Sequence, residues 1–243
     1  VYQPEGRVLR TILTDVGTYT DSSNEIHTIF GVDVFDYSKP VSLINQLLEL
    51  APIKKGDIVV DFFSGSGTTG ESVMRNLSYK DLKFIMVQLD EDLYKHFLNS
   101  TGEERVKYKR TIDFLDYVKR PHTLDQIGIE RIIRAAKAIK EEYPDTTADL
   151  GFKHFTLAEP SQNTLDKLEK FDPYEIKMFA DKSLLDDFGK PTILATWLVR
   201  DGYGLTANAE ELDFAGYKGY YIGKHLYLID PEMPNEAIEE MVV

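Results

Sequence analysis

The feature that most constrains this sequence is a glycine-rich turn that follows directly on an apolar run. The run is Asp57-Ile58-Val59-Val60-Asp61-Phe62-Phe63, and the turn is Ser64-Gly65-Ser66-Gly67-Thr68-Thr69-Gly70. An unbroken apolar run between turn residues predicts a strand buried on both faces, as in a parallel sheet. Gly65 and Gly67 permit a backbone path that β-carbons would block, and they let a ligand come close. Doubly wound sheets bind ligands at this carboxyl end of their strands.

The surrounding pattern alternates between strands and helices. A helix is expected from Pro40 to about Ala51, because its apolar residues recur at helical spacing after a first-turn proline. Further elements are expected as a short helix over 69–76, a strand over 83–89, a helix opening at a Thr123/Gln126 capping box, and a strand over 151–157. This strand–helix alternation predicts an α/β fold, a doubly wound Rossmann-like sheet with right-handed crossovers.

Three other segments have a different sequence pattern. Residues 1–37 carry turn signals and are expected to be the tail of a preceding unit. Residues 92–122 look irregular and locally basic, with seven Lys/Arg against four Asp/Glu between Lys95 and His122. Beyond Pro160 we expect a small α+β subdomain with helices at 161–171, 173–188 and 192–200 and a hairpin of 217–222 with 225–230. The predicted domains are therefore 1–37, 38–159 and 160–243.

Composition excludes several function classes. The chain has 243 residues, 42% of them hydrophobic, so it can fill a sizeable core. It has no cysteine, no apolar run of the ~20 residues that cross a bilayer, and no His pair at metal-ligand spacing. We therefore expect no disulfide, membrane span or metal site, and a cytoplasmic location. The chain begins with Val1 rather than Met, so we expect it to be a piece of something longer.

Charge argues against tight nucleic-acid binding by this chain alone. Its 28 Lys+Arg against 41 Asp+Glu give a net charge of −13, whereas phosphate affinity rests on clustered cations. The excess of acidic residues lies largely near the C-terminus, where residues 201–243 hold nine Asp/Glu against two Lys. The part that reads any nucleic acid is therefore expected elsewhere in the protein.

The glycine-rich turn admits more than one interpretation. A Walker phosphate loop requires a lysine after the second glycine, and none follows Gly67. A dinucleotide site requires a third glycine three residues further on, and Gly70 supplies it, so that alternative stays open. A tight strand-to-helix turn without a ligand also stays open.

The same residues resemble a known family. The pattern Asp61-Phe62-Phe63-Ser64-Gly65-Ser66-Gly67-Thr68-Thr69 is similar to the S-adenosylmethionine loop of amino-directed DNA methyltransferases. Phe35-Asp36-Tyr37-Ser38-Lys39-Pro40 resembles the Lys-Pro segment that precedes this loop in their circularly permuted β group. Three further segments, 84–89, 127–135 and 149–153, resemble the second strand, the following helix and the third strand of type III restriction–modification (Mod) subunits. The resemblance covers roughly residues 10–230, and the chain resembles the C-terminal part of such a subunit.

The resemblance implies roles for particular residues. Ser64, Gly65, Ser66, Gly67, Thr68 and Thr69 would hold the carboxylate of S-adenosylmethionine at a helix start, where negative charge is favoured. Asp61 would bind its amino group, Phe62 and Phe63 would lie beside it, and Ser38, Lys39 and Pro40 would cross its methionine end. Gln88 is expected to bind the ribose, where the family usually carries an acid, and Asp90 is the fallback.

One departure from the family limits the predicted activity. The family transfers its methyl group with an Asp/Asn-Pro-Pro-Tyr/Phe segment, and these 243 residues contain no Pro-Pro dipeptide. In the β group that segment and the target-recognition region precede the Lys-Pro segment. We therefore expect the cofactor-binding part of a DNA adenine-N6 methyltransferase, inactive alone because base flipping needs both halves.

The expected partners also come from the resemblance. They are DNA through the upstream region, the restriction (Res) subunit and a second Mod chain. One alternative is a non-catalytic assembly module whose acidic 160–243 region docks the restriction subunit or a second Mod chain. Another is a methyltransferase for RNA or a small molecule, which would lack the upstream target-recognition region.

Overall fold

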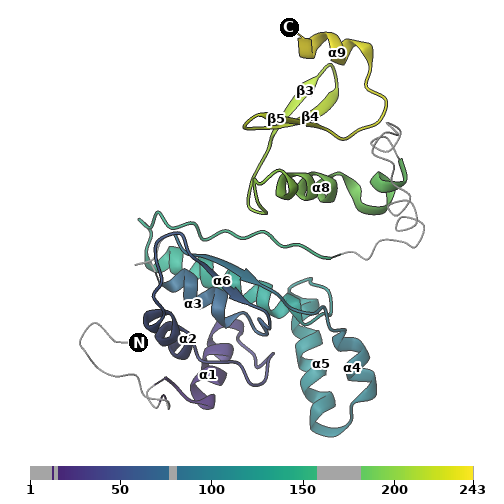
Figure 1. The fold of residues 1–243 in the computed structure, drawn as a ribbon. Coiled ribbons are helices and arrows are strands. Elements are labelled where there is room, and N and C mark those ends of the chain that lie inside the picture. The colour runs from purple at the N-terminus through teal and green to yellow at the C-terminus, as the bar shows by residue number, and fades with distance from the viewer. Residues whose placement is uncertain (1–12, 14–15, 77–80, 158–181, 243) are drawn as a thin grey trace. The chain divides into compact units, whose positions relative to one another are not determined.

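The computed structural model describes residues 13, 16–76, 81–157 and 182–242. The chain divides into two compact units, Val1–Gly151 and Phe152–Val243, each described here by itself (Figure 1). In the first unit the elements are α1 Tyr19–Phe30, α2 Val41–Leu50, β1 Ile58–Asp61, α3 Thr68–Arg75, β2 Lys83–Met86, α4 Leu93–Asn99, α5 Gly102–Tyr117 and α6 Asp125–Glu142. The predicted domains 1–37, 38–159 and 160–243 stay predictions.

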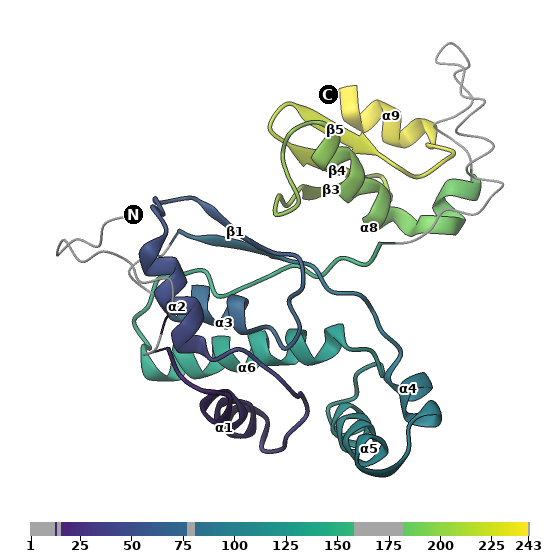
Figure 2. The same cartoon turned by 60° about the horizontal axis from the view of Figure 1, so that its bottom comes forward.

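Strands β1 and β2 form a parallel pair that follows the predicted order. Ile58 is opposite Lys83 and Asp61 is opposite Met86, with helix α3 making the crossover between the strands. Helices α3 and α6 lie together beneath one face of this pair (Figure 2). A mixed α/β fold is thus confirmed, whereas the full Rossmann-like sheet is not, because the first unit has only these two strands among its described residues.

The other face of the pair is exposed within the first unit. Its side chains alternate with the covered ones along each strand, as the two-residue period of a strand requires. The exposed set is Ile58, Val60, Phe62, Ile85, Val87 and Leu89. Strands that are apolar on both faces belong to sheets covered on both sides, so this pair is built for further cover.

The main core of the first unit lies between helices that are distant in sequence. It contains Ile26, Phe30, Val34, Leu93, Ile112, Phe114, Leu115 and Ile127. Ring centroids of Phe30 and Phe114 are 5.3 Å apart in an edge-on contact. Helix α1 thus contributes directly to this core, with a capping box of Thr18 and Asp21 at its start. No periodic apolar pattern in residues 1–37 indicated this.

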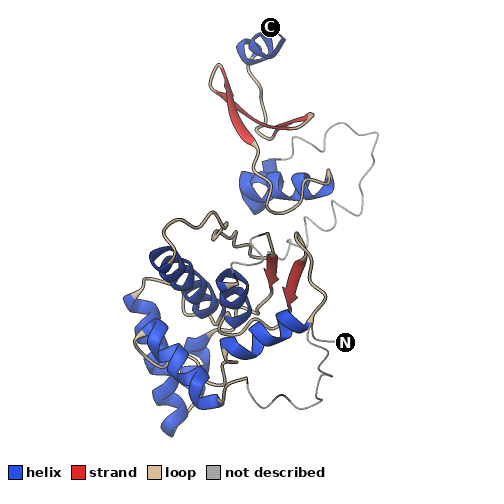
Figure 3. Ribbon diagram, turned by 90° about the vertical axis from the view of Figure 1, so that its left-hand side faces the viewer, coloured by secondary structure: helices blue, strands red, loops and turns tan. Residues whose placement is uncertain are grey.

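Two expectations for the first unit are wrong. Residues 92–122 are not irregular but form α4 and α5, which lie side by side (Figures 1 and 3). Their charged residues hide the helical period, and burial of Leu93, Ile112 and Leu115 against other helices stabilises them. Residues 151–157 form no strand, because no neighbouring strand among the described residues pairs with them.

Helix α6 begins slightly differently from expectation. Leu124 is its N-cap and no side chain caps it; the hydroxyl of Thr123 donates instead to Asp125 at 2.5 Å. Its apolar residues are not all covered: Ile133 is 41% exposed, while Ile127, Ile132, Ala135 and Ile139 are buried. Neighbouring helices, rather than the apolar period alone, decide which side of this long helix is covered.

The second unit has the small mixed architecture predicted for it. Its described elements are α8 Lys182–Arg200, β3 Glu210–Phe214, β4 Tyr217–Ile222, β5 His225–Leu228 and α9 Asn235–Val242. The three strands form an antiparallel sheet in the order β3-β4-β5, which confirms the predicted hairpin. Helix α8 is kinked at Gly189 (φ 72°), two residues before Pro191. The helix expected over 161–171, and most of that over 173–188, lie outside the described residues.

Candidate functional site

The glycine loop, residues Ser64–Gly67, lies where β1 ends and α3 begins. Gly65 has φ 50° and Gly67 has φ 85°, in the left-handed region that favours glycine. The amide of Gly67 donates to the carbonyl of Ser64 at 2.8 Å and closes the turn. Gly67 is also the N-cap of α3, and no side chain caps that helix. The first amides of α3 therefore lack both intrahelical partners and a protein cap, as an anion site requires.

The loop lies against α6 on one side and Phe35 on the other, and its contact with α6 leaves no room for a Cβ at Gly67. A Cβ on Gly67 would be 2.8 Å from the carbonyl oxygen of Gly128, which is itself a glycine in the first turns of α6. A Cβ on Gly65 would be 3.2 Å from the ring of Phe35. The loop is thus held between α6 and the segment that precedes the Lys-Pro residues.

Asp61 ends β1 and its carboxylate points back into the loop. Oδ2 accepts a hydrogen bond from the hydroxyl of Thr69 at 2.6 Å, and Oδ1 accepts one from the amide of Phe63 at 3.0 Å. Each carboxylate oxygen retains acceptor capacity after these bonds. An oriented acid at this position is suited to bind an ammonium group.

Gln88 lies beyond β2 and contacts the same loop. Its Oε1 accepts from the amide of Gly65 at 2.8 Å, and its Nε2 donates to the carbonyl of Leu89 at 3.3 Å. The side chain that was expected at a ribose therefore also anchors the glycine loop. Asp90 is exposed and makes no hydrogen bond or ion pair with the described residues.

A buried hydroxyl cluster of Ser38, Ser66 and Thr68 joins the Lys-Pro segment to the glycine loop. Ser38 Oγ lies 2.8 Å from Ser66 Oγ and 3.2 Å from Thr68 Oγ1. The Thr68 hydroxyl also donates to the carbonyl of Lys39 at 3.1 Å. The predicted residues on both sides are thus brought together, 28 or more positions apart in sequence.

Arg131, on α6, lies at the centre of this cluster and is fully buried. Its Nη1 is 3.0, 3.0 and 2.8 Å from the oxygens of Ser38, Ser66 and Thr68. Its Nε donates to Glu71 at 2.6 Å, and Nη2 lies 3.6 Å from Glu25. Burial raises the pKa of Glu25, against the opposing hydrogen bond from the Val41 amide and the charge of Arg131.

The remaining predicted residues differ in exposure. Pro40 is buried at the start of α2, whereas Lys39 is exposed. Phe62 and Phe63 are 67% and 90% exposed, so their rings are free to contact a ligand or another chain. Phe62 lies in the exposed apolar face of the β1–β2 pair.

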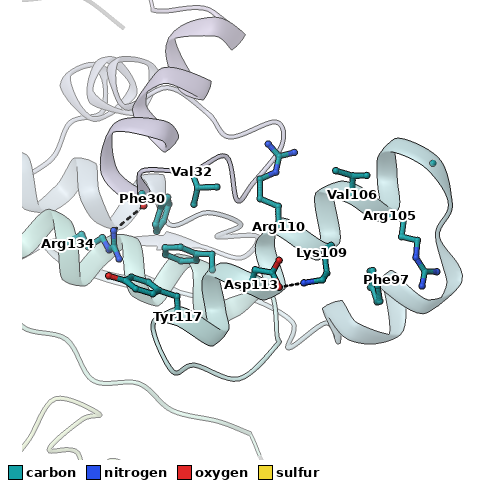
Figure 4. Close-up of a pocket in the computed structure, with 12 residues that line it drawn as sticks. Phe30, Val32, Phe97, Arg105, Val106, Lys109, Arg110, Asp113, Tyr117 and Arg134 are labelled. Carbon is teal, nitrogen blue, oxygen red and sulfur yellow. Dashed lines mark hydrogen bonds and ion pairs between the residues drawn. The ribbon is translucent and has the colours of Figure 1, made fainter.

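A separate hollow of about 940 Å³ lies between the end of α1, α4, α5 and α6 (Figure 4). It contains none of the residues expected to hold the cofactor. Its cations are engaged: Lys109 pairs with Asp113, Arg110 with Asp33, and Arg134 with Glu130. Arg105 stacks over Phe97 at 4.2 Å. These contacts are those of charged side chains covering an aromatic core.

Two kinds of feature are absent from the described parts of the chain. No helix there has the length and apolar character needed to cross a membrane. No group of three or more His, Asp or Glu side chains there is arranged to hold a metal ion. The arrangement around the glycine loop therefore remains the candidate site.

The comparison with family models decides the family. A model described as DNA methylase matches residues 2–141, which include β1, the glycine loop, α3 and α6. The chain belongs to the DNA methylase family. A second model, described as the type III restriction–modification EcoP15I C-terminal domain, matches residues 188–243 of this methylase chain.

Similar proteins include Mod subunits of type III systems. The StyLTI Mod subunit of Salmonella typhimurium is 32% identical over 99% of this chain, and the EcoP15I Mod subunit of Escherichia coli is 30% identical over 91%. The type II methyltransferase M.KpnI of Klebsiella pneumoniae is 32% identical over 45% of the chain. The methylase chain spans only 38% and 30% of the length of the two Mod subunits. The predicted resemblance to the C-terminal part of a type III Mod subunit is confirmed.

Several residues of the methylase site were not singled out by sequence reasoning. Arg131 and Gly128 lie in the segment that resembles the family helix, but their types gave no hint of contact with the glycine loop. Glu71, only 5% exposed, follows the loop by one turn. A charged residue on the mainly apolar face of this amphipathic helix is the signal that could have indicated Arg131.

Proposed function

We propose that this chain forms the S-adenosylmethionine-binding part of a site-specific DNA adenine-N6 methyltransferase of the type III Mod kind. The observation that carries the proposal is the glycine loop at the carboxyl end of a parallel strand pair. Two positive-φ glycines, an uncapped helix start and an oriented carboxylate converge there. Membership of the DNA methylase family supports the same cofactor.

The groups present fit the chemical parts of this cofactor. The first amides of α3 are suited to its carboxylate, and Asp61 to its ammonium group. Gln88 keeps a second Oε1 lone pair and one Nε2 hydrogen for the ribose hydroxyls. The exposed ring of Phe63 offers an apolar face, and Lys39 crosses the methionine end. Asp90 is the second choice for the ribose.

When bound, the cofactor would supply an activated methyl group: its methyl–sulfur bond would break as the bond to the N6 amine of adenine forms, the thioether would leave, and the amine proton would pass to solvent. The residues of this chain bind and orient. They would hold the cofactor end that does not react and so fix where the methyl group is presented. Orientation of this kind supplies much of the rate of a transfer reaction. None of these residues is assigned to catalysis.

We place the catalytic Asp-Pro-Pro-Tyr segment and the DNA-reading region outside these 243 residues. The exposed apolar face of β1 and β2 supports this, because it requires cover by further polypeptide. DNA, the restriction subunit and a second Mod chain are then the proposed partners of the whole protein. The names of the relatives, Mod subunits of type III restriction-modification enzymes, support the first two. By itself the chain binds the cofactor and transfers no methyl group.

Calorimetric titration with S-adenosylmethionine tests the proposal. The wild-type chain is expected to release heat on binding, and Gly65→Trp to abolish it, because an indole would occupy the space between the loop and Phe35. Gly56→Trp is the matched control, since Gly56 also has positive φ but no atom within 4 Å of its Cβ position. No binding by the wild type, or equal binding by Gly65→Trp, would contradict the proposal.

An alternative function is a non-catalytic assembly module. The match of residues 188–243 to a type III C-terminal domain and the acidity of that region favour it. The exposed acids Glu239 and Glu240 of α9 offer a test. Glu239→Lys/Glu240→Lys should weaken association with the restriction subunit or a second Mod chain, measured by light scattering, and leave cofactor binding unchanged. An unaltered complex would argue against the module.

A further inference from the structure

We infer that Arg131 is a positioning residue, which sets the separation between the Lys-Pro segment (Ser38-Lys39-Pro40) and the glycine loop. The inference rests on the function proposed above, because these two segments would enclose the methionine end of the cofactor. Arg131 is fully buried and lies behind both segments. It acts through their hydroxyl groups and has no exposed surface for a ligand.

The geometry joins one guanidinium to both segments at once. Nη1 lies 3.0 Å from the hydroxyl of Ser38 on one side, and 3.0 and 2.8 Å from those of Ser66 and Thr68 on the other. All three oxygens converge on a single nitrogen. A change in the position of Arg131 therefore changes the relative position of the two segments.

The polarity of these bonds is fixed by chemistry. A guanidinium only donates, so the hydroxyl oxygens around Nη1 accept from it, and its two hydrogens are shared among the three oxygens. Their own hydrogens are then directed elsewhere: that of Thr68 to the Lys39 carbonyl, and one of the two serine hydrogens across the 2.8 Å gap between Ser38 and Ser66. Arg131 thereby orients the carbonyl of Lys39 as well as the start of α3.

The position of Arg131 is itself set by carboxylates. Nε donates to Glu71 at 2.6 Å, and Glu71 in turn accepts from Arg75 at 2.7 Å. Nη2 is buried without a hydrogen-bond partner and lies 3.6 Å from Glu25 of α1. Burying such a group is costly, and apolar residues can often replace buried ion pairs without loss of stability. A positioning role accounts for retaining the charge here.

The test compares Arg131→Lys with Arg134→Lys, a matched substitution one turn further along α6. Arg134 pairs with Glu130 and donates to the carbonyls of Ile29 and Phe30, away from the glycine loop. Lysine keeps the charge but cannot span Glu71 and the hydroxyl cluster together. Affinity for S-adenosylmethionine, melting temperature, and amide hydrogen exchange of Ser64–Gly67 are measured for each variant.

Arg131→Lys should weaken cofactor binding about tenfold or more, which corresponds to ~1.4 kcal/mol, and should speed exchange of the loop amides. Arg134→Lys should lower the melting temperature while keeping the wild-type affinity and loop exchange. Wild-type affinity in Arg131→Lys would overturn the inference while leaving the proposed function intact. Absence of binding by the wild type would instead overturn the proposed function.

A second variant covers the case in which Arg131→Lys does not fold. Arg131→Met/Glu71→Gln removes both charges of the 2.6 Å ion pair and keeps similar volumes, a replacement that folded proteins often tolerate. It should fold and bind the cofactor about tenfold or more weakly, because the hydroxyl cluster loses its common donor. Full affinity in this folded double variant would also overturn the inference.

Discussion

Gly67 and Gly128 face one another so closely that Gly67 has no room for a Cβ and Gly128 has little. A Cβ on Gly67 would lie 2.8 Å from the carbonyl oxygen of Gly128, and a Cβ on Gly128 would lie 3.2 Å from the carbonyl oxygen of Gly65. The glycine loop thus rests on the backbone of α6. Any change at this contact moves the proposed cofactor site together with the helix that carries Arg131.

The first prediction concerns this contact. Gly67→Ala combines positive-φ strain with a backbone clash, whereas Gly56→Ala has the same φ of 85° and open space around the added methyl. Both variants should lose ~1–2 kcal/mol of unfolding free energy, because left-handed backbone geometry is unfavourable for L residues. Gly67→Ala should lose a further ~1–3 kcal/mol through overpacking. Urea unfolding measures both variants. Equal losses would show that the loop can move away from α6.

The second prediction separates the two roles of Gln88. Gln88→Leu removes the bond to the Gly65 amide, so it should cost about 1 kcal/mol of stability and weaken cofactor binding. Gln88→Glu keeps an acceptor for that amide and adds a carboxylate at the proposed ribose position. It should therefore retain cofactor affinity in calorimetry, with little change in unfolding. A loss of affinity equal to that of Gln88→Leu would exclude a ribose contact.

The third prediction is a pH dependence of stability in the first unit. Burial favours protonation of Glu130, but hydrogen bonds from Arg134 and Arg120 outweigh it and hold the Glu130 pKa below its ordinary 4.5. The native state therefore binds this proton less tightly than the unfolded state, so the stabilisation is present above pH 4.5 and is lost as pH falls through the lowered pKa.

Glu130→Gln tests this sign. It should reduce the free energy of unfolding by about 1–3 kcal/mol at pH 7, and the difference from wild type should shrink below pH 4.5. Glu141→Gln is the control, because Glu141 is 69% exposed and only 3.9 Å from Lys137. A pH-independent difference in chemical unfolding would refute the assignment.

The fourth prediction concerns the second unit. Burial and a 2.6 Å hydrogen bond to Asp201 raise the pKa of Tyr227 to about 12 from its ordinary 10. The neutral phenol is thus favoured in the native state, so its stabilisation is present below pH 10 and is lost as pH rises towards 12. Tyr227→Phe should remove a tyrosinate absorbance step near pH 12. Persistence of that step in Tyr227→Phe would contradict the assignment.

Elements defined by neighbouring residues were predictable. The strand before Ser64, the turn at Gly65 and Gly67 and the helix that follows depend on apolar runs and on backbone freedom within a few positions. The same holds for the hairpin of 217–222 with 225–230, whose turn contains Gly223 with a positive φ of 59°. It was also predicted that the Lys-Pro segment and the glycine loop lie together, but this prediction came from the family resemblance and not from any local pattern.

Contacts between distant residues were not predictable. Residues 151–157 have a strand-like sequence but no neighbouring strand within the described part of the chain, and a strand exists only when its hydrogen bonds find partners. Helices α4 and α5 carry many charges, and burial of a few apolar residues against α1 and α6 stabilises them.

By itself, the sequence determined the local path of the glycine loop, the family and the identity of the candidate ligand-binding residues. Only the tertiary structure decided that Arg131 and Gly128 lie behind that loop and that Gln88 anchors it. The physical reason is the distance along the chain over which each interaction acts. Backbone freedom and apolar period act between near neighbours, whereas the position of a buried guanidinium depends on carboxylates and hydroxyls brought from several elements at once.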